Sequence, residues 1–290
     1  MTTDRRGAIV GIDGSPGSNA ALSWAIARTD RLGPIRPVYA WEYPAAVWLP
    51  APFAATAVPP SEEMQAAAEE AALACEVMLA DVEHDPPVVR RGDASTVLLD
   101  EASDARVLIV GTRGHGPILD AILGSVGRRC ADKTSVPLVI VPRCEPPSEA
   151  HLAERIVVGV DGSEHAAAAL RWAIQVAGPD DEIVAVSTWT TPIPIGIDVP
   201  RFDVVALRAE AQRVVDLAVE EQCAKAGIGP GRVIRHVTEG DPRWVFKEME
   251  KEAGLLVLGA RGHTGLSHLV LGSTTTSLIH APHCAVAVVP

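Results

Sequence analysis

Two copies of a glycine-rich segment hold the residues in this sequence that are best suited to bind a ligand. The first copy begins Gly111-Thr112-Arg113-Gly114 and, nine residues further on, ends Gly124-Ser125. The second copy lies 148 residues later and keeps the same glycines and serine, at Gly259, Gly262, Gly272 and Ser273. Glycine lets a backbone bend sharply and approach a ligand, and a helix that begins at Gly-Ser offers unpaired N–H groups and its positive dipole end to an anion. The spacing therefore predicts a phosphate-binding loop in each copy.

Neither copy fits the two commonest nucleotide-binding loops. A Walker A loop needs a lysine directly after its last glycine, and no Gly-Lys dipeptide occurs in the chain. Gly11, Gly14 and Gly17 have the wrong first spacing for a Rossmann fingerprint, and His165 stands where the second repeat would need its third glycine. The alternative to a ligand site is that the loop glycines serve tight turns only.

The elements that must hold these loops are duplicated with the same offset. Asp13 corresponds to Asp161, and Trp41 corresponds to Trp189. A period of this length indicates a duplicated domain, because solenoid repeats are about 20–50 residues long. We expect one domain over residues 1–143, a linker over 144–154 and a second domain over 155–290.

Strand and helix patterns alternate in both halves, which indicates α/β domains with mostly parallel sheets. Short apolar runs predict buried strands over 8–11, 35–41, 88–91, 107–110 and 138–141, then over 156–160, 182–189, 233–237, 255–258 and 285–289. Helices are predicted over 18–28, 61–82 and 94–103 and from 124, then over 164–177, 204–226 and 243–253 and from 272. Ser15 and Ser163 are placed to cap the first helix of each half.

Composition excludes several classes of function. The net charge of −12 argues against a nucleic-acid partner, which would require a cationic surface. No apolar run reaches the roughly 18 residues of a membrane span, and no signal-peptide core is present. The five cysteines form no C-x-x-C pair, so a reduced, cytoplasmic setting is expected. No cysteine and histidine set has zinc spacing, so we expect no metal held by protein ligands alone.

Three segments together resemble one known family. These are Val10-Gly11-Ile12-Asp13-Gly14-Ser15, the duplicated G-x2-G-x9-G-S loop and the run Val-Pro-Leu-Val-Ile-Val-Pro that ends at Pro142. They resemble the universal stress protein family, and two copies in one chain resemble its tandem form in actinobacteria. The resemblance implies two tandem doubly wound α/β domains, each a five-stranded parallel sheet flanked by helices, as in adenine nucleotide alpha hydrolase-like folds.

The resemblance also implies an adenine nucleotide at each loop, because the glycine motif marks the ATP-binding branch of the family. The residues implied to hold ribose and phosphates are Gly111, Gly114, Gly124, Ser125 and Val126 in the first half and Gly259, Gly262, Gly272, Ser273 and Thr274 in the second. Gly11-x-Asp13 and Gly159-x-Asp161 would place a carboxylate against polar groups of the nucleoside. Trp41 and Trp189 would lie near adenine, where each indole either stacks on the base or packs in the core.

The expected function is that of an ATP-binding, nucleotide-dependent regulator of stress or growth that is not a dedicated enzyme. ATP, ADP or AMP would be bound, with Mg²⁺ carried by the phosphates. One alternative is a slow ATPase or a nucleotidyl or phosphoryl transferase, for which Arg113 and Arg261 are the basic candidates in the loops, with His115 and His263 beside them. The other alternative is a nucleotide-free interaction scaffold. A homodimer and an unknown protein partner are expected, with no nucleic acid or membrane partner.

Overall fold

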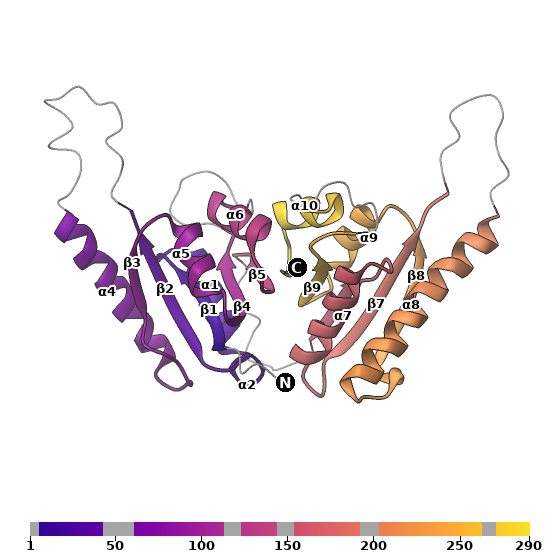
Figure 1. Ribbon diagram of the computed structural model, residues 1–290, viewed down its shortest axis with the longest axis horizontal. Helices are drawn as coiled ribbons and strands as arrows, with labels where there is room; N and C mark the ends of the chain where they lie inside the picture. Colours follow the sequence, from indigo (N-terminus) through magenta and orange to yellow (C-terminus); the bar gives the residue numbers. More distant parts are fainter. Residues whose placement is uncertain (1–5, 43–60, 113–122, 144–153, 192–202, 263–270) are drawn as a thin grey trace, which may run out of the picture. The chain divides into compact units, whose positions relative to one another are not determined.

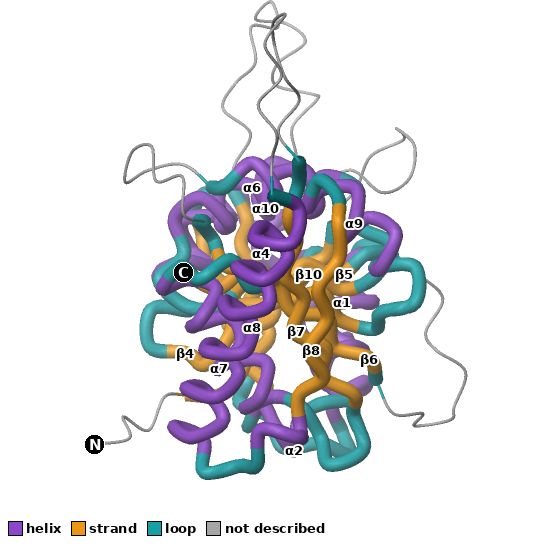
Figure 2. The backbone as a smooth tube through the Cα atoms, turned by 90° about the vertical axis from the view of Figure 1, so that its right-hand side faces the viewer, coloured by secondary structure: helices purple, strands orange, loops and turns teal. Residues whose placement is uncertain are grey.

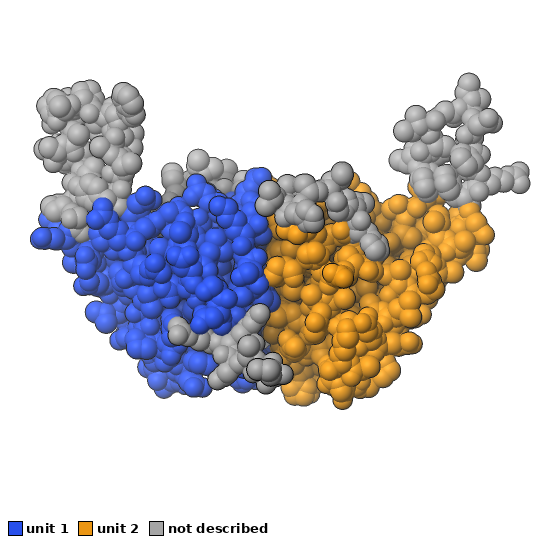
Figure 3. Space-filling view, viewed as in Figure 1, with its two compact units in different colours: residues 1–143 blue, residues 144–290 orange. Residues whose placement is uncertain are grey.

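The structure of the protein is a computed structural model that describes residues 6–42, 61–112, 123–143, 154–191, 203–262 and 271–290. The chain divides into two compact units, Met1–Arg143 and Cys144–Pro290 (Figure 3). The two units share the same order of strands and main helices, and each is described by itself.

In the described part of the first unit, five strands form a parallel sheet. They are β1 (Arg6–Ile12), β2 (Ile35–Trp41), β3 (Val88–Arg91), β4 (Ala105–Gly111) and β5 (Leu138–Val141). The pairings β3 with β2, β2 with β1, β1 with β4 and β4 with β5 are all parallel and give the order β3-β2-β1-β4-β5. All four residues of β5 are buried, as expected for a strand covered on both faces.

The helices of the first unit cover both faces of this sheet (Figure 1). They are α1 (Pro16–Ile26), α2 (Thr29–Leu32), α4 (Ser61–Leu79), α5 (Ala94–Glu101) and α6 (Ser125–Lys133). Right-handed crossovers place α1 and α4 on one face and α5 and α6 on the other, because the chain reverses direction across the sheet after β3. Consistent with this, α1 packs on β1 and β4, α4 packs on β2 and β3, and α5 packs against α6.

The second unit repeats this arrangement. Its strands are β6 (Arg155–Gly159), β7 (Glu182–Trp189), β8 (Val233–Glu239), β9 (Leu255–Gly259) and β10 (Ala285–Val289). The parallel order is β8-β7-β6-β9-β10. The helices are α7 (Glu164–Val176), α8 (Val204–Ala226), α9 (Pro242–Met249) and α10 (Ser273–His280), with a short 3-10 helix η1 (Pro230–Arg232). Figure 2 shows α8 lying along β7 and β8, against which it packs.

Both sheets therefore have a switch point at the carboxyl ends of two adjacent central strands. In the first unit the chain leaves β1 toward one face and β4 toward the other, and in the second unit β6 and β9 do the same. Ligands of doubly wound sheets bind in the crevice outside such strand ends. The doubly wound α/β class predicted from the sequence is confirmed, and the glycine loops leave the sheet at the predicted point.

Candidate functional site

In each unit a backbone hydrogen bond joins the two ends of the glycine loop. This bond fixes the N-terminus of the following helix beside the end of the preceding strand. Gly124 N donates to Thr112 O at 2.7 Å, and Thr112 N donates to Val141 O at 3.0 Å. In the second unit Gly272 N donates to Ala260 O at 2.9 Å. Residues 113–122 and 263–270, between these anchors, lie outside the described residues. The first turn of α6 is thus fixed beside the end of β4, and that of α10 beside the end of β9.

The N-termini of α6 and α10 differ from those of four other helices that start at this edge. Side chains cap α1, α5, α7 and α9, the capping residues being Ser15, Asp93, Ser163 and Asp241. Gly124 and Gly272 provide no side-chain cap, and Ser125 and Ser273 are exposed. First-turn N–H groups without a cap need another acceptor, and an anion is well suited to that position.

Gly124 and Gly272 have space around them. A Cβ at Gly124 would lie 3.4 Å from its nearest described neighbour, Thr112 O, and a Cβ at Gly272 would lie 3.7 Å from Ala260 O. Their φ angles of −68° and −59° suit any residue. The described packing therefore does not require glycine at either position, whereas close approach of a ligand does.

The glycines that end the strands have a different role. A Cβ at Gly111 would lie less than 3.0 Å from the carbonyl atoms of Gly17 in α1, and a Cβ at Gly259 would lie 2.8 Å from the carbonyl carbon of His165. Gly111 and Gly259 thus allow helix and strand backbones to touch. This packing role accounts for glycine at both positions, and the contact of Gly111 with a ligand stays a prediction.

Gly11 and Gly159 likewise face the protein. A Cβ at Gly11 would lie 3.1 Å from the Leu98 side chain, and a Cβ at Gly159 would lie 2.9 Å from that of Leu258. These two glycines are explained by the hydrophobic core. Each lies two residues before the carboxylate of its unit, at Asp13 and Asp161.

Asp13 and Asp161 lie in equivalent turns at the switch points. Oδ1 of Asp13 accepts from Ser15 N at 2.9 Å, and Oδ1 of Asp161 accepts from Ser163 N at 2.9 Å. The glycines that follow have positive φ, 76° at Gly14 and 83° at Gly162, which favours glycine in these turns. Asp13 is half-buried and Asp161 is exposed. The turn therefore fixes each carboxylate at the carboxyl end of its strand through a hydrogen bond to Oδ1.

Neighbours of the two carboxylates differ between the units. Tyr39 pairs with Ile12 across the sheet and so lies beside the strand end that leads to Asp13. Burial and, second, the negative charge of Asp13 raise the pKa of the Tyr39 phenol. Ser187 occupies the corresponding position in the second repeat. A Cβ at Gly262 would lie 2.6 Å from Oδ2 of Asp161, so the start of the second glycine loop runs directly past this carboxylate.

Trp41 and Trp189 end β2 and β7, next to the central strands. Trp41 is only 9% exposed, and the Arg91 guanidinium lies 5.7 Å from its ring centroid. Trp189 is half-buried. Trp41 therefore retains little ring surface for stacking on a base, and Trp189 retains more.

The remaining predicted residues are placed as follows. Val126 and Thr274, in the first turns of α6 and α10, are half-buried, and Arg261 is half-buried at the start of the second loop. Gly114 lies outside the described residues, as do Arg113, His115 and His263. The described residues contain no group of side chains arranged to hold a metal ion.

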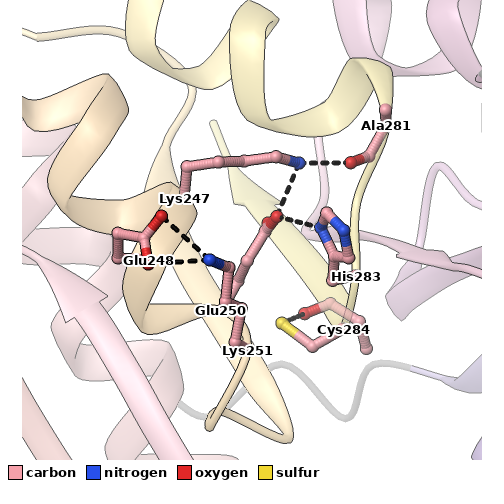
Figure 4. A network of polar contacts seen from close by, with 8 residues as sticks. Lys247, Glu248, Glu250, Lys251, Ala281, His283 and Cys284 are labelled. Atoms are coloured by element: carbon pink, nitrogen blue, oxygen red, sulfur yellow. Dashed lines mark hydrogen bonds and ion pairs between the residues drawn. The ribbon is translucent and has the colours of Figure 1, made fainter.

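A polar cluster around the buried Glu250 carboxylate in the second unit was not predicted (Figure 4). Glu250, at the end of α9, has a fully buried side chain, and its Oε1 lies 2.6 Å from Lys247 Nζ and 2.6 Å from His283 Nδ1. Lys247 also donates to Ala281 O, just after α10. The cluster ties α9 to the segment that ends α10 and so helps to position this helix. The first repeat has Leu99 and Ala102 in place of Lys247 and Glu250.

No helix in the described ranges is both long and apolar enough to cross a membrane.

The fold and this edge define a class: paired doubly wound α/β domains, each with a glycine loop that ends at an uncapped helix N-terminus. A sequence profile of the universal stress protein family matches residues 5–142 and 153–290. The chain belongs to the universal stress protein family.

Individual relatives agree with this assignment over the whole chain. A universal stress protein of Mycobacterium tuberculosis is 26% identical over 294 residues, covering 98% of this chain and 97% of the relative. One of Mycolicibacterium smegmatis is 27% identical over 290 residues, covering 98% and 96%. The crystal structure of a universal stress protein from Archaeoglobus fulgidus has the same fold, with a TM-score of 0.66, 21% identity and 97% coverage of both chains.

Proposed function

We propose that this chain binds one adenine nucleotide at each glycine loop and acts as a nucleotide-dependent regulator of stress or growth. The observation that carries the proposal is the N-terminus shared by α6 and α10. In both units the helix begins at a glycine that the described packing does not require, has no side-chain cap, and is held beside the strand end at the switch point. Such a terminus suits a phosphate group.

The nucleoside would lie near the carboxyl end of the first strand of each unit, β1 or β6. Neighbouring strands are about 4.8 Å apart, so the Asp13 turn after β1 lies one strand away from the loop that leaves β4. Ribose hydroxyls or an adenine N–H would donate to the carboxylates of Asp13 and Asp161. ATP, ADP and AMP all meet these requirements, and Mg²⁺ would be carried by the phosphates.

Regulation would follow from a shift between conformations or assemblies. A nucleotide changes such an equilibrium only by the difference in its affinity for the two states. We propose that a protein partner senses the nucleotide-bound state and that the chain forms a homodimer. Light scattering with and without ATP measures the assembly state.

Isothermal titration of ATP into the nucleotide-free full chain tests binding. Two sites per chain are expected, and Gly124→Glu and Gly272→Glu should each remove one site, since each places an anion where the phosphates would lie. Both positions accept a Cβ, so both variants should keep the melting temperature of the parent. No binding near millimolar ATP, or unchanged binding in the double variant, would refute the proposal.

A further inference from the structure

The two loops end in helices of different charge. The first turns of α6 carry Arg128 and Arg129, whereas the corresponding residues of α10 are Thr276 and Ser277. Arg129 is already paired, since its guanidinium lies 2.8 Å from the carboxylate of Asp93. Arg128 is exposed, and its side chain takes part in none of the described ion pairs or hydrogen bonds, although its backbone N donates to Gly124 O at 3.1 Å.

The position of Arg128 in the helix directs it toward the N-terminus. Residues three apart share a helix face about 5–6 Å from one another, so Arg128 lies beneath Ser125. Long helical side chains lean toward the N-terminus of the helix and cover the preceding turn. The Arg128 guanidinium is thus within reach of anionic groups at the start of α6. Thr276 has the same relation to Ser273 but provides only a short hydroxyl side chain.

A second, independent difference in charge lies beside the tryptophan of each site. Each site tryptophan pairs across the sheet with a charged residue, but the charge is inverted. Trp41 pairs with Arg91, and Trp189 pairs with Glu239. The Glu239 carboxylate accepts from Thr191 Oγ1 at 3.4 Å. Two equivalent positions thus make the surroundings of the first site more positive than those of the second.

We infer that the two sites differ in the ligand they select: the first favours a nucleoside triphosphate through Arg128, and the second discriminates little by phosphate number. This inference rests on the proposed function. A charge-assisted hydrogen bond to a phosphate oxygen contributes about tenfold or more in affinity. Each added phosphate increases the negative charge of the ligand near Arg128. The Arg128 guanidinium therefore raises the affinity for ATP more than the affinity for AMP. Thr276 offers a hydroxyl hydrogen bond without net charge.

The experiment measures ATP and AMP affinities by isothermal titration in full-length chains that retain one site. Gly272→Glu leaves the first site and Gly124→Glu leaves the second. The ratio of ATP to AMP affinity should be about tenfold larger at the first site. Adding Arg128→Thr should reduce that ratio about tenfold, and adding Thr276→Arg to the chain with the second site should raise it. Lys133→Thr is the matched control, because it removes a cation about 12 Å from the N-terminus of the same helix, beyond the screening length of about 8 Å.

Three results would overturn the inference. Equal ratios at the two sites would remove its basis. A loss of ATP and AMP affinity by the same factor in Arg128→Thr would show that this residue does not sense phosphate number. Both results would leave the proposed function standing, whereas failure of both nucleotides to bind at both sites would end the proposed function and this inference together.

Discussion

Replacing Gly111 by alanine should destabilise the first unit, and the loss of stability should already be present in nucleotide-free protein. The new Cβ would lie less than 3.0 Å from the carbonyl carbon and oxygen of Gly17, and both are backbone atoms of a packed helix. Since neither atom can rotate away, α1 and β4 must separate. Overpacking of this kind costs about 1–3 kcal/mol, and a domain of this size loses about 2–4 °C of melting temperature per kcal/mol. We expect a decrease of about 2–12 °C.

The assay is differential scanning calorimetry of nucleotide-free protein, with Gly124→Ala as the matched control. A Cβ at Gly124 has 3.4 Å to its nearest described neighbour, so the control should melt within about 1 °C of the parent while weakening ATP binding. Gly259→Ala should lie between the two variants, because its Cβ meets His165 less closely than the Gly111 Cβ meets Gly17. A parent-like melting temperature for Gly111→Ala, or a larger loss for Gly124→Ala, would refute the division into packing and ligand-facing glycines.

Three further predictions concern the polar groups. Lys247→Met should lower the free energy of unfolding by about 1–3 kcal/mol, because it removes a partner of the buried Glu250 carboxylate. In the same urea denaturation, the control Lys251→Met should cost under about 1 kcal/mol, because Lys251 is exposed. Equal losses in the two variants would contradict a stabilising role for the cluster. Hydrogen bonds from Ser95 and Thr96 lower the pKa of Asp93 in the folded state. Its carboxylate therefore stabilises the protein fully above the unfolded pKa of 3.8, and this stabilisation is lost as the pH falls through the folded pKa. The difference in stability between the parent and Asp93→Asn should shrink from pH 7 toward pH 3.5, and a constant difference would contradict this linkage. Burial and the charge of Asp93 raise the pKa of Cys130 to about 12, so a disulfide reagent at pH 8 should label this thiol only after unfolding, and rapid labelling of native protein would show that it is accessible.

The sequence predicted most of the fold because its signals are local. Strands β2, β3, β5, β7 and β10 and helix α8 have the bounds that the apolar runs and the turn residues indicated. Ser15 and Ser163 cap their helices as expected, accepting from Ser18 N and Ala166 N at 3.2 Å. The short helices α2 and η1 were missed, because segments of three or four residues show no hydrophobic periodicity.

The parts of the candidate site that the sequence missed depend on contacts between distant elements. Sequence spacing cannot separate Gly111, where a Cβ would clash with another helix, from Gly124, where a Cβ would make only a van der Waals contact with its nearest described neighbour. The cluster of Lys247, Glu250 and His283 joins residues 33 positions apart, and charged residues on helices usually mark solvated faces. The first repeat has Leu99 and Ala102 at the positions equivalent to Lys247 and Glu250. This difference between the repeats is the sequence signal that could have pointed to the cluster.

Native mass spectrometry of the full chain with increasing ATP tests the central claim most directly, because it counts bound nucleotides on each molecule. The account predicts complexes with one and then two nucleotides for the parent, and at most one for Gly124→Glu and for Gly272→Glu. A parent chain that stays free of nucleotide at millimolar ATP, or a double variant that still binds two, would contradict it.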